Sequence, residues 1–323
     1  LELFSLLPLE LKYNKENFQY MLLSFQFSEK IYKTLYFDNQ VIREHIKKLI
    51  KISEYYIYNK DFENLLKQYL NIVDFTQNIL DTKNSSPEIR NIYLKYLALV
   101  IQSFEIKGDY DKTFYYSDIL LKYTKDRYAD TNLDSDLQKL VIAININGSL
   151  LLKLGRYNDA DKILNDALNL SKDTKPLLSA LSNLNIGDLF FLKREFTKAL
   201  KSYNITLDIL DKDNDRKISN MNLLATTYER LANTYLKLND FAKSGEFYTK
   251  NYGIIRGLYE NDKDSPISNT FMQTTFSNLA SLSLLKEDYT QSDNYYNQSI
   301  EILNFLKQKL NNSQNLDLQL GST

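Results

Sequence analysis

The fold is decided by residues 144–168, which read ININGSLLLKLGRYNDADKILNDAL. Before the central Gly155, the positions spaced by three and four along one helical face are Ile144, Asn147, Gly148, Leu151 and Leu154. After it, a second face of the same period contains Tyr157, Ala160, Leu164, Ala167 and Leu168. Glycine readily adopts the left-handed conformation that ends a helix, so Gly155 marks a turn. The stretch therefore predicts two antiparallel helices joined by a tight turn.

The same turn phrase occurs six times along the chain. It has a polar or glycine residue, a second polar residue, an aromatic residue and, three positions later, a small or apolar residue. The aromatic residues are Phe62, Tyr110, Tyr157, Phe196, Phe241 and Tyr289, so successive copies are 48, 47, 39, 45 and 48 residues apart. A signal that recurs at a nearly regular interval is typical of repeat proteins. We therefore expect six helix pairs.

Small and large residues also recur at fixed distances from the turn. Seven residues before the turn residue, the four later copies have Gly148, Gly187, Ala232 and Ala280. Three residues after the aromatic they have Ala160, Ala199, Ser244 and Ser292, and four residues further on Leu164, Tyr203, Tyr248 and Tyr296. Small residues let paired helices approach to about 8–10 Å, and large residues fill the space between pairs. In the two earliest copies, Ser53 and Ile101 occupy the small position.

These positions resemble the signature of the tetratricopeptide repeat (TPR) family over roughly residues 46–311. The copy with Gly148, Gly155, Tyr157 and Ala160 matches best. The chain departs from the family pattern because it has no Trp at the first signature position and no Pro closing each repeat. Its period also exceeds the family's usual length of about 34 residues, so we expect longer helices. Long-helix arrays look similar to kinesin light chains, to peptide-pheromone-sensing regulators of bacteria and to repeat arrays fused to other domains.

The resemblance implies an all-α, right-handed α-solenoid of about six TPR-like helix pairs. We expect an N-terminal helical cap at residues 1–45, the solenoid at residues 46–311 and a polar C-terminal tail at residues 312–323. The first helix of each pair would form the inner wall of the array.

Composition excludes several kinds of site. The 323 residues include no Cys and one His, so the chain has no disulfide, thiol nucleophile or site that needs two imidazoles. The formal net charge is -1, so a strongly basic nucleic-acid-binding surface is not expected. The sequence contains no run of ~18 apolar residues, which is the length needed to span a bilayer. The opening LELFSLLPLE does not resemble a signal peptide, and we expect a cytoplasmic protein with no membrane partner, cofactor or metal.

One calcium-loop pattern is incomplete. Asp211, Asp213 and Asp215 have the spacing that begins such a loop, but Arg216 and Asn222 stand where the loop needs Gly and Glu. A solvated turn is therefore expected here.

No catalytic residue is assigned. Phosphate-binding loops, nucleophile elbows and zinc-protease helices do not occur in the sequence. The lone histidine, His45, lies among charged residues of an expected helix at residues 41–58, and we expect it at the surface. The protein is not expected to be an enzyme.

Function is expected on the inner wall, next to the small signature residues. Asn recurs there in each of the four later copies, and its carboxamide can hold both the N–H and the C=O of an extended peptide. Related arrays also hold peptides with groove Asn residues, as the resemblance implies. The candidate peptide-binding residues are Asn145, Ser149, Asn185, Asp188, Arg230, Asn233, Asn278 and Ser281. Arg230 is the cation that could bind a carboxylate.

Three functions stay open. The first is a non-catalytic scaffold that binds a protein or peptide in its concave groove, with binding on the convex face or the array ends as the alternative place. The second is a regulatory domain that senses a peptide by changing its pitch. The third is the regulatory arm of a larger enzyme such as a protease or kinase, since the sequence begins at Leu1 rather than Met. The resemblance implies that family members which bind chaperone C-termini use a clamp of two lysines. In this chain Lys153 and Lys237 lie beside apolar residues, so binding of chaperone C-termini is disfavoured.

Overall fold

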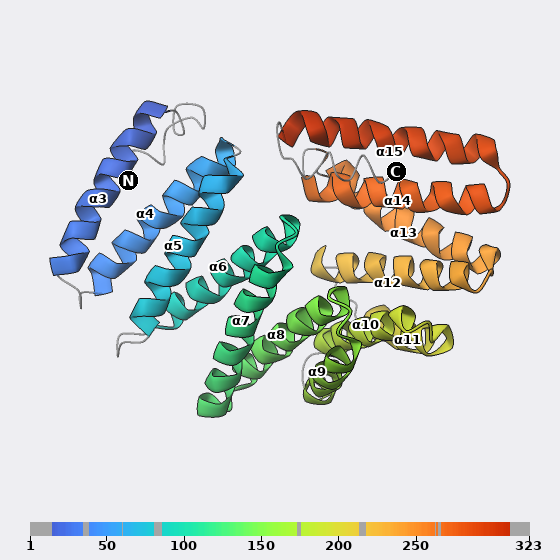
Figure 1. Cartoon of the computed structure of the whole chain (residues 1–323), viewed down its shortest axis with the longest axis horizontal. Helices are drawn as coiled ribbons and strands as arrows, with labels where there is room; N and C mark the ends of the chain where they lie inside the picture. The colour runs from blue at the N-terminus through green and yellow to red at the C-terminus, as the bar shows by residue number, and fades with distance from the viewer. Residues whose placement is uncertain are drawn as a thin grey trace. The chain divides into compact units, whose positions relative to one another are not determined.

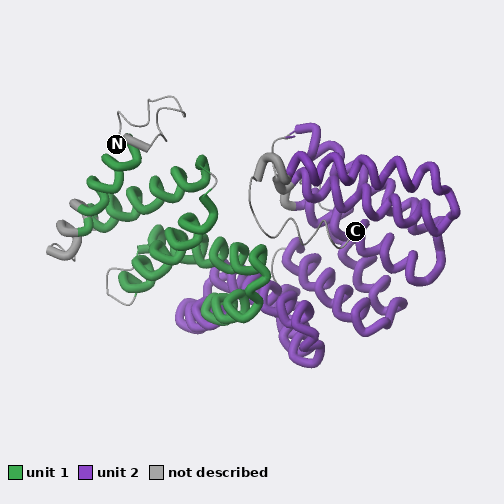
Figure 2. Tube along the Cα trace, turned by 45° about the horizontal axis from the view of Figure 1, so that its top comes forward, with its two compact units in different colours: residues 1–120 green, residues 121–323 purple. Residues whose placement is uncertain are grey.

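The chain is all-α in the part that its computed structural model describes. This part comprises residues 15–34, 39–59, 61–80, 86–172, 176–212, 218–261, 263 and 266–310. It contains 13 α-helices and no strand (Figure 1). The chain forms two compact units, unit 1 at residues 1–120 and unit 2 at residues 121–323 (Figure 2). The all-α prediction is confirmed.

Six helix pairs follow one N-terminal helix, α3 (Lys15–Thr34), in the described residues. The first helices are α4 (Asn39–Tyr58), α6 (Pro87–Ile106), α8 (Asp134–Lys153), α10 (Pro176–Leu192), α12 (Ile218–Lys237) and α14 (Pro266–Leu285). The second helices are α5 (Phe62–Leu80), α7 (Tyr110–Thr131), α9 (Tyr157–Ser171), α11 (Phe196–Lys212), α13 (Phe241–Asn261) and α15 (Tyr289–Leu310). Each second helix begins at the aromatic residue of a turn phrase.

Each described turn residue has left-handed backbone geometry. The φ angles range from 60° to 71° at Gly108, Gly155, Arg194, Asn239 and Glu287. The backbone N–H of the next residue then donates to a carbonyl five positions earlier, as in Arg156 to Leu151 at 2.9 Å. This bond satisfies an orphan carbonyl at the helix end. The left-handed conformation predicted for Gly155 is confirmed, and three of the other turns achieve it without glycine.

Aspartate residues then start four of the second helices. The side-chain Oδ1 atoms of Asp61, Asp109, Asp240 and Asp288 each accept a backbone N–H three residues later, at 3.1–3.2 Å. A carboxylate at this position satisfies a free helical N–H and interacts favourably with the positive end of the helix dipole. The turn phrase is therefore both a helix stop and a helix start.

Small residues bring the paired helices together as predicted. A Cβ atom on Gly148 would overlap the side chain of Leu164, and one on Gly187 would overlap the ring of Tyr203. Both of these large side chains are fully buried. In the last pair, the Ser292 hydroxyl donates to the Ala280 carbonyl at 3.1 Å.

Consecutive pairs stack within unit 2. Helix α10 packs against both helices of the preceding pair, α8 and α9, and also against α12 of the following pair. One apolar cluster joins Tyr203 of α11 to Leu231 of α12, and a second joins Tyr248 of α13 to Leu279 of α14. First helices are therefore neighbours along the stack.

His45 is buried, so the expectation of a surface position was wrong. The side chain is 2% exposed, and its ring lies 4.9 Å from that of Phe25 and 4.6 Å from that of Phe75. Helix α3 packs on α4 and covers this position, although charged residues flank His45 in sequence. Its spacing from Ile42 and Leu49 places it on the buried stripe of α4.

The domain division at residues 45 and 46 stays a prediction, and α4 already begins at Asn39. The tail at residues 312–323 and the part of the expected cap at residues 1–14 lie outside the described residues. The incomplete calcium loop also lies there from Asp213 to Arg216.

Candidate functional site

The eight candidate residues lie on first helices of unit 2, and we call them the first-helix row. They are Asn145 and Ser149 on α8, Asn185 and Asp188 on α10, Arg230 and Asn233 on α12, and Asn278 and Ser281 on α14. Their role in binding stays a prediction, and the structure shows what each side chain contacts.

Asn145 and Asn185 bond to each other across two helices. The Asn185 Nδ2 atom donates to Asn145 Oδ1 at 2.8 Å, and Asn145 Nδ2 donates to Ser182 Oγ at 2.9 Å. The two asparagines are 2% and 8% exposed. Half-buried Ser149 donates to the Ile146 carbonyl at 2.9 Å. At this end of the row, the carboxamides link α8 to α10.

Asp188 and Arg230 form an ion pair between α10 and α12. The distance from Arg230 Nε to Asp188 Oδ1 is 2.9 Å, and the Arg230 side chain is 34% exposed. Burial opposes the charge of Arg230, but the neighbouring Asp188 and Glu229 outweigh it and raise the pKa of the guanidinium. The charge that Arg230 could offer to a ligand carboxylate is therefore largely neutralised by Asp188.

Tyrosines of the second helices form hydrogen bonds with residues of the first-helix row in the same pair. Tyr203 donates to Asp188 Oδ1 at 2.7 Å, and Tyr248 donates to Asn233 Oδ1 at 2.5 Å. Burial and then Asp188 raise the pKa of Tyr203, so its hydroxyl stays protonated as a donor. In the last pair, the Tyr296 and Ser281 hydroxyls are 3.5 Å apart. These contacts orient the row, and sequence reasoning missed them although each tyrosine lies seven residues after its turn aromatic.

Asn233, Asn278 and Ser281 are partly exposed, and Asn278 contacts Glu229 of α12. Asn278 Nδ2 donates to Glu229 Oε1 at 3.4 Å, and Arg230 Nη1 lies 3.7 Å from the same oxygen. Both distances are long for a charged acceptor. The structure therefore brings Arg230 and Asn278 together at a carboxylate that sequence reasoning did not select.

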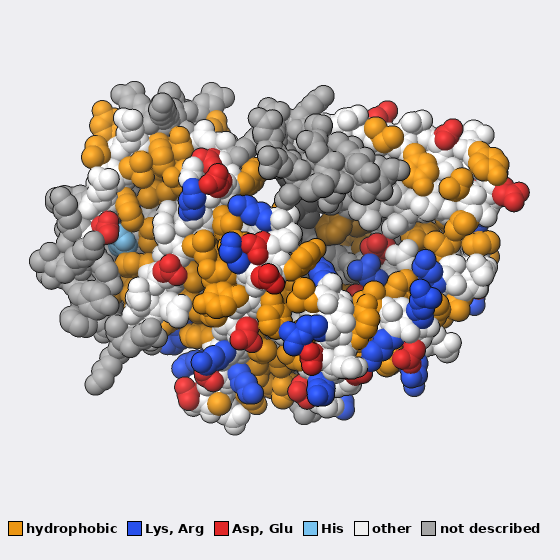
Figure 3. All heavy atoms as spheres, viewed as in Figure 1, with side chains coloured by type: hydrophobic (Ala, Val, Ile, Leu, Met, Phe, Trp, Pro, Cys, Tyr) orange, Lys and Arg blue, Asp and Glu red, His pale blue; other side chains and the backbone are white. Residues whose placement is uncertain are grey.

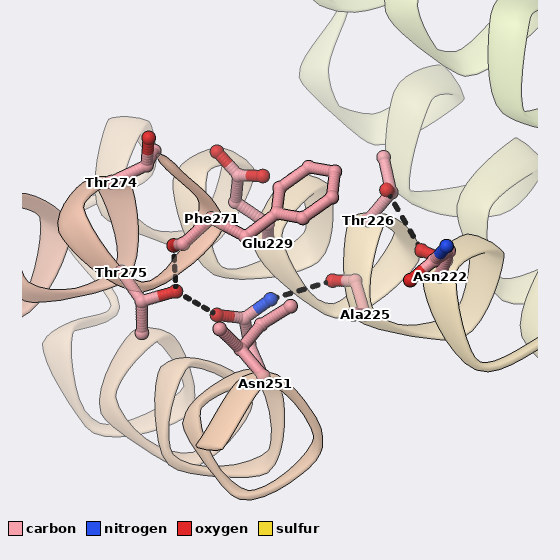
Figure 4. A pocket seen from close by; sticks show the side chains of 9 residues that line it. Asn222, Ala225, Thr226, Glu229, Asn251, Phe271, Thr274 and Thr275 are labelled. Atoms are coloured by element: carbon pink, nitrogen blue, oxygen red, sulfur yellow. Dashed lines mark hydrogen bonds between the residues drawn. The ribbon is translucent and has the colours of Figure 1, made fainter. Parts of the chain in front are cut away.

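A pocket lies between α12 and α14, above α13, and we call it the α12–α14 pocket. Figure 4 shows the side chains around it. Its lining residues are Asn222, Ala225, Thr226, Glu229, Asn251, Ile255, Phe271, Thr274 and Thr275. Asn222, Thr226 and Glu229 continue the helical stripe of Asn233, and Phe271 and Thr274 continue that of Asn278. This shared spacing is the signal that could have found the pocket from sequence.

Charge is mixed over the face seen in Figure 3, where basic and acidic side chains are interspersed. Within the described residues, no three metal-ligating side chains gather into a potential metal site. None of the helices in those residues combines the length and the apolar character needed to cross a bilayer.

Comparisons with known proteins identify the repeats. The family model described as "Tetratricopeptide repeat" matches residues 147–174 and 225–253, so these two segments have the sequence pattern of tetratricopeptide repeats. The matched segments include the α8–α9 and α12–α13 turns. A search of curated proteins finds no match.

Two solved structures show the same fold at low identity. The crystal structure of BtubC (BKLC) from P. vanneervenii aligns with a TM-score of 0.52 and 15% identity, over 74% of this chain and 91% of that chain. The structure of RapI in its apo form aligns with a TM-score of 0.51 and 15% identity, over 81% of this chain and 99% of that chain. The chain is thus a TPR-like helical repeat protein.

Proposed function

We propose that the protein is a non-catalytic scaffold whose first helices in unit 2 bind an extended peptide or partner segment. The observation that carries this proposal is a polar stripe on neighbouring faces of α12 and α14, interrupted by Phe271, that lines the α12–α14 pocket and includes the partly exposed end of the first-helix row. Polar side chains on neighbouring helices offer donors and acceptors to a peptide backbone. The buried pairs of the row would support this surface.

Roles within the row follow from exposure. Asn233, Asn278 and Ser281 are partly exposed and would contact the peptide. Asn145 and Asn185 would hold α8 and α10 in register, with Ser149 at the edge. Asp188 and Arg230 would fix the spacing of α10 and α12 while leaving part of the guanidinium accessible.

Selection of displayed random peptides on the immobilised full chain tests the proposal. Selected peptides should bind Asn233→Ala/Asn278→Ala at least about tenfold more weakly than the wild type, because two carboxamide contacts are lost. The matched control is Asn165→Ala/Asn297→Ala, which removes two exposed asparagines from second helices. Fluorescence anisotropy would measure each dissociation constant. Equal weakening by both double variants would contradict binding on the first helices.

A peptide sensor is the second candidate function. The Asp188–Arg230 ion pair joins two consecutive first helices beside Glu229, so a ligand charge there would alter the contact that sets their spacing. Small-angle scattering with a saturating selected peptide would show a changed radius of gyration for a sensor. An unchanged scattering profile would exclude the sensor and leave the scaffold as the remaining proposal.

A further inference from the structure

The α12–α14 pocket is small and open to one side. It has room for about one or two groups the size of a water molecule. An ammonium group is of this size, whereas the guanidinium of arginine is a larger planar fork. The size of the pocket therefore favours a compact ligand group.

Glu229 is the single charged residue among the nine that line the pocket. Its carboxylate contacts Arg230 at 3.7 Å, but Arg230 makes its closer ion pair with Asp188 at 2.9 Å. Two carboxylates thus share one guanidinium, and this group of three side chains carries a net charge of -1. A cation at Glu229 would complete its neutralisation.

The other polar groups offer acceptors. The hydroxyls of Thr226 and Thr274 donate to the carbonyls of Asn222 and Thr270, at 2.9 and 3.0 Å. A threonine hydroxyl whose hydrogen is engaged still has lone pairs that accept a hydrogen bond. An ammonium group has three donors and no acceptor, so it matches this lining.

An aromatic ring completes the chemistry. Phe271 lines the pocket and is 40% exposed, so its ring is accessible to a ligand there. The face of an aromatic ring attracts a nearby cation, with a larger effect when the cation is desolvated. Figure 4 shows the Phe271 ring and the Glu229 carboxylate among the residues around the pocket.

We propose that the α12–α14 pocket binds a primary ammonium group of the peptide, from either a lysine side chain or the amino terminus. The inference rests on the proposed function, because it names the ligand group that the same polar stripe selects. Arginine would bind less well, since the guanidinium exceeds the free space of the pocket and would meet only the Glu229 carboxylate.

The test uses the full chain with labelled Ile and Thr methyl groups and n-butylammonium as the probe. Titration followed by NMR should shift the signals of Ile255 and Thr274, and n-butylguanidinium should bind at least about tenfold more weakly. Glu229→Gln should weaken n-butylammonium binding about tenfold or more, since the charged acceptor is lost. The control Glu301→Gln removes an exposed carboxylate on α15 and should change nothing.

Thr274→Val is the second variant, because it keeps the shape and leaves the Glu229 network in place. It should weaken n-butylammonium binding severalfold. Equal shifts with neutral n-butanol, equal binding of the guanidinium, or full binding by Glu229→Gln would each overturn the inference.

Two peptides, each with a single ammonium group, separate the sources of that group. One is acetylated and contains a single lysine among alanines, and the other has a free amino terminus and only alanines. The peptide that shifts Ile255 identifies the source. If selected peptides bind through Asn233 and Asn278 but no ammonium group enters the pocket, the inference fails and the proposed function stands. If n-butylammonium binds but no peptide does, the proposed function fails instead.

Discussion

Gly187 is a position where one methyl group would collide with a buried side chain. Its would-be Cβ overlaps the Tyr203 ring, and Tyr203 is fully buried with its hydroxyl bonded to Asp188. A shift of the ring to make room would strain that bond and the packing around it. We expect Gly187→Ala to destabilise the protein by about 1–3 kcal/mol, as overpacking does. Urea denaturation followed by circular dichroism would measure the change.

Gly253→Ala is the matched control for Gly187→Ala. Gly253 also lies within a helix, α13, but nothing lies within 4 Å of its would-be Cβ. Alanine there should stabilise the protein by about 1 kcal/mol through helix propensity. A gain in stability from both substitutions would show that Gly187 is not required for close packing.

His45 makes the stability of unit 1 depend on pH. Burial lowers its pKa from 6.5 to about 4, with Glu29 opposing and Lys48 adding to the shift. The folded state therefore favours the neutral ring. The contribution of the neutral ring to the free energy of unfolding is fully present above pH 6.5 and is lost as the pH falls towards 4. The shift corresponds to about 3 kcal/mol.

The free energies of unfolding of the wild type and of His45→Phe should therefore diverge as the pH falls. Phenylalanine keeps an aromatic ring between Phe25 and Phe75 but does not titrate, so the variant should lose less stability between pH 7 and pH 4. Urea unfolding at pH 7, 5.5 and 4 measures the difference, and carboxylate titration is common to both proteins. Parallel losses would mean that His45 is accessible to protons in the folded state.

At the scale of the element, the helix–turn–helix junctions differ in strain. Arg194 and Glu287 have φ angles of 61°, a region that costs a residue with a side chain about 1 kcal/mol. Both are exposed, so glycine removes few contacts there. We expect Arg194→Gly and Glu287→Gly each to stabilise by about 0.5–1 kcal/mol, measured by thermal unfolding. Asn239→Gly should stabilise the protein by less, because asparagine tolerates the left-handed conformation. An equal gain in stability from all three substitutions would show that relief of backbone strain is not the cause.

At the scale of the whole molecule, stacked pairs contact mainly their neighbours, so damage should remain local. Hydrogen exchange of Gly187→Ala should show faster exchange in α10 and α11 and in the pairs next to them. Amides of unit 1 should keep the protection of the wild type. Uniformly faster exchange in both units would indicate that the chain unfolds as one cooperative body.

The sequence by itself determined the helix pairs, because their signals are local. The turn phrase predicts the first residue of all six second helices, from Phe62 to Tyr289, and the small residues Gly148 and Gly187 mark the close contacts. It also indicated which residues share one face of each first helix, since helical period alone sets that.

Only the tertiary structure decided how the polar side chains are used. Asn145 and Asn185 are 40 residues apart and bury each other's carboxamides, and Asp188 and Arg230 are 42 residues apart and pair their charges. His45 is covered by α3, and the pocket needs Glu229 of α12 and Phe271 of α14 together. A side chain becomes buried, paired or available only when another pair packs against it, and helical period carries no information about that neighbour.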